Sequence, residues 1–288
     1  MADAGIVVFQ LQLKGILSNE RDTILDKNIE ALHDLRVATR RLRVAVDIFG
    51  RYYDSIKVKN ISKGLKRIGN ILGDARDLDV IISIVSDRME NMEVVSRVDL
   101  SLFYNYLLSK RSEVRVNLCC FLTSKPYKKT KKSLRSIIQN HQYTDHSEND
   151  FTSVKDLYQQ IIDDEKANVN NFQSLMTSPS IKDLHRLRIA FKKLRYTIEI
   201  FFHSIGDEAY RSIEFLKVVQ DKLGQIHDLS MILNEIENLQ SYQNSDKEKP
   251  DLVDINQFKW SVINERGVLI NEFHPLWNYY CEASSKQF

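Results

Sequence analysis

The chain has 288 residues, with 41 lysines and arginines against 39 aspartates and glutamates, so its formal net charge is only +2. That balance argues against a histone-like tail or a globally basic nucleic-acid coat, but it allows a local anion site, because charge acts through its distribution. Nine glycines and four prolines, against roughly 20 and about 14 at average usage, leave little room for the tight turns of an all-β fold. The composition therefore predicts a long, mostly helical chain.

Hydrophobic periodicity predicts an all-α fold along the whole chain. Apolar residues recur at helical spacing, and no convincing run of alternating residues indicates a strand. Asp77 and Asp228 each follow a glycine-containing break and precede an apolar run, so both are predicted N-caps, and a bend is expected at Pro275. The predicted helices span residues 6–17, 29–50, 57–72, 77–91, 95–123, 127–139, 151–176, 181–204, 207–223, 228–242 and 252–284.

The cysteines and the apolar segments restrict the cellular setting. Cys119, Cys120 and Cys281 are an odd count without Cys-x-x-Cys spacing, which predicts a reducing compartment and neither a disulfide framework nor a zinc site. No segment approaches ~18 consecutive apolar residues, the length typical of a membrane span. We therefore expect a cytoplasmic protein without a membrane segment and without a metal or cofactor.

A duplicated block indicates two related halves. Residues 33–49 recur as residues 185–201 at a constant offset, and both copies share the pattern His-x-Leu-Arg-x-Ala-x-basic-basic-Leu-Arg. A second pattern, Leu-Gly-x-x-x-Asp-Leu, follows at residues 72–78 and again at residues 223–229. Two matched blocks in the same order indicate an internal duplication. The sequence predicts a single domain with homologous helical halves at about 1–124 and about 151–288, joined by a basic and polar connector at 125–150.

Each copy of the first pattern places four cationic or histidine side chains on one helix face. At about 100° per residue, the four fall within an arc of roughly 80°, opposite the apolar residues. Like charges at this spacing repel one another. Rows with few acids nearby therefore indicate a site for an extended anion, and arginine and lysine donors suit phosphate oxygens. The first cationic row is His33, Arg36, Arg40 and Arg43, and the second cationic row is His185, Arg188, Lys192 and Arg195.

Further basic residues accompany the rows. Arg41 and Lys193 lie on the flank of each helix, and Lys66 and Lys217, in matching places on the next predicted helix, would widen the surface. The basic run at residues 125–135 is interpreted as a solvated flank, with contact to the ligand as the alternative.

The two copies, with the Leu-Gly-x-x-x-Asp-Leu segments that follow them, resemble the CHAD family, the conserved histidine α-helical domain. The resemblance extends from about residue 6 to about residue 284. It implies two helical-bundle halves around a pseudo-twofold axis, and a central basic surface or pore that binds inorganic polyphosphate. The resemblance assigns polyphosphate contacts to His33, Arg36, Arg40, Arg41, Arg43, His185, Arg188, Lys192, Lys193 and Arg195, and in second rank to Lys66 and Lys217.

Two other functions stay open. The adjacent pairs His33-Asp34 and His227-Asp228 are similar to the metal-binding pair of helical HD phosphohydrolases, but the second copy has Arg186 in place of Asp34, and that chemistry needs further ligands. The rows would also follow the phosphates of a nucleic acid, although reading bases requires an aromatic platform or a recognition helix. We therefore expect a polyphosphate-binding module without chemistry of its own, possessing no nucleotide-binding glycine loop, and of unknown oligomeric state.

Overall fold

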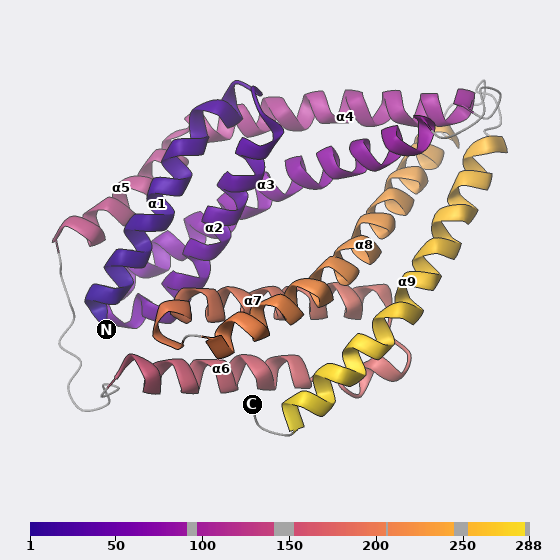
Figure 1. Cartoon of the computed structure of the whole chain (residues 1–288). Coiled ribbons are helices and arrows are strands. Elements are labelled where there is room, and N and C mark those ends of the chain that lie inside the picture. Colours follow the sequence, from indigo (N-terminus) through magenta and orange to yellow (C-terminus); the bar gives the residue numbers. More distant parts are fainter. Residues whose placement is uncertain (91–96, 141–152, 206, 245–252, 286–288) are drawn as a thin grey trace. The chain divides into compact units, whose positions relative to one another are not determined.

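The structure is a computed structural model (Figure 1), and it describes residues 1–90, 97–140, 153–205, 207–244 and 253–285. Nearly all of these residues lie in α-helices, and none of them lies in an extended strand, which confirms the all-α prediction. Within the same ranges, no helix is long and apolar enough to cross a membrane.

The helices vary widely in length. In chain order the elements are α1 (Ala2–Ile24), α2 (Ile29–Phe49), η1 (Gly50–Tyr52), α3 (Ser55–Glu90), α4 (Arg97–Thr123), α5 (Lys125–Asn140), α6 (Val154–Asn170), η3 (Leu175–Thr177), α7 (Ile181–Ile205), α8 (Asp207–Asn244) and α9 (Val253–Ser285).

Two predicted helix breaks are wrong. The predicted helices 57–72 and 77–91 are one continuous helix, α3, and the predicted helices 207–223 and 228–242 are one continuous helix, α8. Asp77 and Asp228 therefore lie inside helices and are not N-caps. A single glycine costs a helix interior only about 1 kcal/mol relative to alanine. Buried leucines next to Gly73 and Gly224 outweigh that cost, because both helix segments pack against a core.

Several helix ends also differ from the prediction. Helix α1 continues to Ile24 and not only to residue 17, with Thr23 buried near its end. Helix α6 ends at Asn170, and turns followed by the short helix η3 replace the predicted continuation to residue 176. Helix α9 is assigned without interruption through Pro275. Part of the predicted connector, residues 141–150, lies outside the described residues, as does Pro250.

The chain forms two compact units that are interleaved along the sequence. Unit 1 comprises Met1–Arg76, Val114–Glu165 and Lys193–Ile213, and unit 2 comprises Asp77–Glu113, Lys166–Lys192 and Glu214–Phe288. Helices α3, α4, α6, α7 and α8 each contribute a segment to both units. The units are therefore not the same divisions as the two sequence halves. The homology of the halves, the pseudo-twofold axis and the central pore stay predictions.

In unit 1, α1 lies beside α2 and also contacts α5 (Figure 1). A single hydrophobic core joins these helices to the adjoining parts of α3, α4 and α7. Phe49 of α2 packs against Phe201 of α7 with ring centroids 6.0 Å apart, and Phe9 packs against Tyr53 at 5.5 Å. Because Leu35 and other apolar residues of α2 face this core, the first cationic row occupies the opposite side of the helix.

In unit 2, the first part of α7 packs against α8 and α9. Phe191 lies 5.0 Å from the Tyr280 ring and 6.3 Å from the Trp277 ring, in edge-on geometry. Gln220 of α8 donates a hydrogen bond from Nε2 to the Phe191 carbonyl at 2.9 Å. The buried side chains of Leu187 and Phe191 thus fix the rotation of α7 and direct the second cationic row away from the core.

Candidate anion-binding surfaces

The first cationic row is carried by α2, a helix that begins with a side-chain cap. Asn28 Oδ1 accepts a hydrogen bond from the Glu30 backbone N–H at 2.9 Å, which satisfies one of the free donors at the N-terminus. The three arginines of the row are half-buried, and His33 is the most exposed member. All four belong to unit 1, so the structure keeps the predicted row together.

Two arginines of the row lie against the backbone of α3. Arg43 Nη1 is 3.4 Å, and Arg36 Nη2 is 3.6 Å, from the positions that a Cβ atom would occupy on Gly69 and Gly73. Lys66 precedes these glycines by three and seven residues, so it projects from the same face of α3. Lys66 is exposed. The predicted association of Lys66 with the first cationic row therefore fits the geometry of unit 1.

His33 lies close to both cations and acids. Partial burial, followed by the charges of Arg76 and Arg36, lowers the pKa of His33, while Glu30 and Asp34 act in the opposite direction. Arg76 was not among the predicted site residues. Its position could have been found from the repeat, because it matches His227 in the second Leu-Gly-x-x-x-Asp-Leu segment.

The C-terminal part of α7 brings a tyrosine and a carboxylate to the first cationic row. Arg40 Nη1 donates to Tyr196 Oη at 3.2 Å, and the Arg195 guanidinium lies 5.0 Å from the centre of the Tyr196 ring. Arg41 donates from Nε and Nη2 to Glu199 Oε2 at 3.0 and 2.8 Å. Arg195 Nη1 lies 3.2 Å from the other carboxylate oxygen of Glu199.

These contacts show that the basic residues of the two copies are paired in part with acids. Glu199 neutralises Arg195 of the second row and Arg41 on the flank of the first. Lys193, the flank residue of the second copy, forms an ion pair with the buried carboxylate of Glu165 at 2.6 Å. Both flanking cations therefore form ion pairs with acids of unit 1. A ligand would have to compete with these acids for Arg41 and Lys193.

The remainder of the second cationic row lies in unit 2, where its histidine meets another histidine. Nδ1 of His185 on α7 lies 3.2 Å from Nδ1 of His227 on α8, with ring centroids 4.9 Å apart. One of the two nitrogens must carry the proton and donate to the other. The sequence did not assign His227 to the site, although the adjacent repeat segment contains it.

Cations surround this histidine pair. Burial, followed by Arg188, lowers the pKa of both histidines, Lys192 adds to the effect, and Asp77 opposes it. Both rings are therefore neutral at neutral pH. Lys217 of α8 forms an exposed ion pair with Glu214 at 2.7 Å. Its predicted role in binding stays a prediction.

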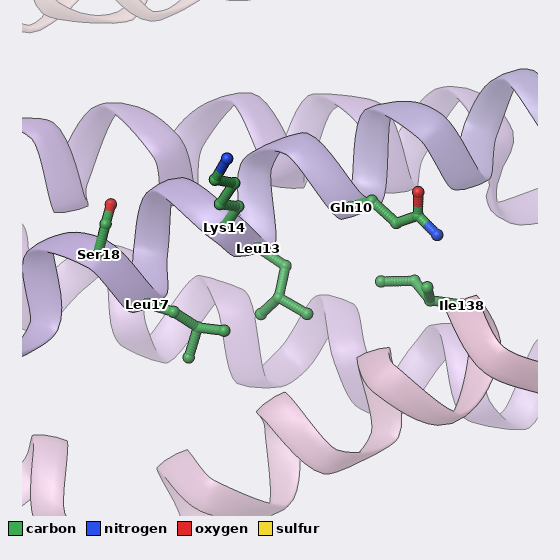
Figure 2. Close-up of a pocket in the computed structure, with 6 residues that line it drawn as sticks. All are labelled: Gln10, Leu13, Lys14, Leu17, Ser18 and Ile138. Carbon is green, nitrogen blue, oxygen red and sulfur yellow. The ribbon is translucent and has the colours of Figure 1, made fainter.

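An open groove in unit 1 is chemically different from the cationic rows. Figure 2 shows Leu13 and Leu17 projecting from α1 on the side of Ile138, which belongs to α5. Lys14 supplies the charge among the residues that line this groove. The lining is largely apolar, so the groove is not a candidate site for a polyanion.

The family model of the CHAD domain matches residues 7–236, and the chain therefore belongs to the CHAD family, as the paired motifs predict. Two solved structures share its fold. The crystal structure of the CHAD domain from the plant Ricinus communis is 22% identical with a TM-score of 0.70, covering 94% of this chain and 86% of that chain. PptA from Streptomyces chartreusis is 12% identical with a TM-score of 0.71, covering 98% and 99%. The comparison with curated proteins found no match.

Proposed function

We propose that the protein binds inorganic polyphosphate through its cationic rows, without chemistry of its own. The observation that carries the proposal is the environment of three histidines, His33 in unit 1 and His185 with His227 in unit 2. Besides burial, neighbouring arginines lower the pKa of each of them. Burial is the largest cause of each lowered pKa, and at His185 and His227 the effect of Arg188 exceeds that of Asp77, so the field of neighbouring charges is positive there and favours a polyanion.

The chemistry of the donors favours a phosphate polymer over a single nucleotide. The donors are side chains on rigid helices, spread over α2 and α3 in unit 1 and over α7 and α8 in unit 2. Guanidinium groups bind phosphate oxygens through several N–H donors, and neutral histidine rings add a donor or gain a proton next to phosphate. Sites repeated along helices match a ligand with repeated charge. The proposal includes a cytoplasmic location, at polyphosphate granules.

Titration with three polyanions tests the proposed function. We expect long-chain polyphosphate to bind more tightly than single-stranded or double-stranded DNA at matched phosphate concentration. The salt concentration is held fixed, because binding of all three polyanions depends on it. Tighter binding to DNA would contradict the proposal and favour a nucleic-acid-binding protein. Metal-dependent release of phosphate from polyphosphate with Mg²⁺ or Mn²⁺, lost in His33→Ala, would instead favour a phosphohydrolase.

A charge-matched pair of variants separates the rows from general electrostatics. The test variant replaces Arg36, Arg40, Arg188 and Lys192 with alanine. The control variant replaces Lys14, Lys27, Lys155 and Arg211, four exposed cations outside the rows, with alanine. Both lose four positive charges. We expect polyphosphate affinity to fall by at least about 100-fold in the test variant, whereas equal losses in both would show that the rows are only solvated surface.

A further inference from the structure

Helix α5 exposes a row of cations without any acid. At about 100° per residue, five basic side chains fall within an arc of roughly 120°, and residues 125–140 contain no aspartate or glutamate. The opposite side of α5, with Tyr127 and Leu134, is buried in the core of unit 1. The exposed cations are Lys125, Lys128, Lys129, Lys132 and Arg135.

The first part of α3 has the same character. Residues 55–73 contain no aspartate or glutamate. Four basic side chains of this segment are exposed, and the Arg67 guanidinium lies 5.1 Å from the centre of the Phe121 ring. The exposed cations are Lys59, Lys63, Lys66 and Arg67.

These two helices are in direct contact, so their cationic faces adjoin. A Cβ atom on Gly64 of α3 would overlap the side chain of Thr130 on α5. On α3 the buried residues and the exposed cations lie on either side of Gly64, and on α5 the exposed cations lie opposite the buried residues. Because both helices share one core, both sets of cations point away from it into solvent. We name these nine side chains the α3–α5 basic surface.

The α3–α5 basic surface is continuous with the first cationic row. Around the circumference of α3, the exposed cations extend from the side of Gly64 to Lys66. Lys66 shares a face with Gly69 and Gly73, beside which the guanidinium groups of Arg43 and Arg36 lie. Cationic side chains therefore extend from α2 across α3 to α5 within unit 1.

The nine cations are not neutralised by partners in the described part of the chain. None of them forms an ion pair or a side-chain hydrogen bond with a described residue. The neighbouring Lys131 shows the contrast, because it forms an ion pair with Glu20 at 2.5 Å. Nine adjoining like charges cost free energy unless an anion approaches them.

We propose that a polyphosphate chain held at the first cationic row continues over Lys66 and α3 onto the exposed face of α5. This inference rests on the proposed function and extends it to the path of long chains. The surface has no exposed aromatic platform for bases, since Tyr127 and Phe121 are buried. Helix α5 exposes no large apolar side chain for insertion into a membrane.

Ligands of two lengths test the path. The α5 variant replaces Lys128, Lys129, Lys132 and Arg135 with alanine, a residue that preserves helix propensity. We expect its affinity for tripolyphosphate to be unchanged and its affinity for long-chain polyphosphate to fall about tenfold, with a shallower dependence on salt. The charge-matched control is the variant lacking Lys14, Lys27, Lys155 and Arg211, and circular dichroism verifies that both variants keep their helices.

The outcomes separate this inference from the proposed function. Unchanged affinity of the α5 variant for long-chain polyphosphate would overturn the path over α5. A loss of DNA binding alone would overturn it as well, by assigning the surface to nucleic acid. The proposed function itself fails if Arg36→Ala with Arg40→Ala leaves the affinities for both tripolyphosphate and long-chain polyphosphate unchanged.

Discussion

The two cationic rows have matching sequences but different surroundings. The first row lies wholly on α2 in unit 1. The second row is divided, because His185, Arg188 and Lys192 belong to unit 2, whereas Arg195 belongs to unit 1 and is paired with Glu199. The two copies of the motif therefore lie in different electrostatic environments in the folded protein.

The histidines show the same difference. His33 lies in the field of Arg76, and His185 lies beside His227, which occupies the matching position of the repeat. Arginine is always charged, whereas histidine titrates near neutral pH. The first site therefore carries a permanent positive charge where the second acquires one only on protonation. We therefore expect the two cationic rows to contribute unequally to polyphosphate binding, and with a different dependence on pH.

The largest expected effect comes from removing one row at a time. We expect Arg36→Ala with Arg40→Ala to weaken long-chain polyphosphate binding about 100-fold, since two charge-assisted contacts are lost. Arg188→Ala with Lys192→Ala should weaken it only about tenfold, because the second row is divided between the units and its Arg195 is already paired with Glu199. Isothermal titration calorimetry at fixed salt measures both. Equal losses would mean that the rows are equivalent despite their surroundings.

The next effect concerns pH. Burial and nearby cations lower the pKa of His185 and His227 in the free protein. Bound phosphate favours the protonated form, so binding takes up protons and affinity rises as pH falls, by up to about tenfold per pH unit for each proton. Affinities measured at several pH values should show this rise.

A matched pair of variants assigns the pH dependence. His185→Gln with His227→Gln should remove most of the rise in affinity, because the pair titrates in unit 2. His33→Gln, whose neighbour Arg76 stays charged, should remove less. A larger change in the His33 variant would reverse the comparison between the two sites.

A fall in pH raises the expected affinity for polyphosphate, but in the free protein it lowers the stability of the fold through the histidine pair. The pKa of His227 is lower in the folded protein than its ordinary value of 6.5, so the unfolded chain binds more protons below that pH. Stability is fully present above pH 6.5 and falls as the pH drops toward the folded pKa. We expect a loss of about 1 kcal/mol over the first pH unit. Urea unfolding of the unaltered protein and of His227→Gln checks it, and identical slopes would refute the assignment.

The smallest effect concerns the matching glycines of α3 and α8. A Cβ atom on Gly73 would lie 3.6 Å from Arg36 Nη2, whereas one on Gly224 has no atom within 4 Å. We expect both alanine variants to stabilise their helices by up to about 1 kcal/mol. Only Gly73→Ala should also change polyphosphate binding, by about twofold at most, since its methyl group would lie in van der Waals contact with the Arg36 guanidinium. Thermal unfolding and titration measure the two effects, and altered binding in Gly224→Ala would contradict the distinction.

The fold class followed from local patterns. Helical periodicity and scarce glycine and proline predict an all-α chain, and the rows of α2 and α7 follow from their spacing alone. The same local logic was wrong at Gly73 and Gly224, where glycine predicted a break. A glycine's cost is local and small, but burial of the flanking leucines depends on helices that are distant in sequence.

The sequence by itself determined which side chains share a helix face, because an α-helix fixes the direction of each residue relative to its near neighbours. Only the tertiary structure decided that the two flanking cations meet an acid. Arg41 meets Glu199, and Lys193 meets Glu165, across separations that no local pattern encodes. It also brought His227 to His185 and joined the cations of α3 to those of α5. Electrostatic fields depend on distances in space, so the charge of a site is settled only when the helices pack.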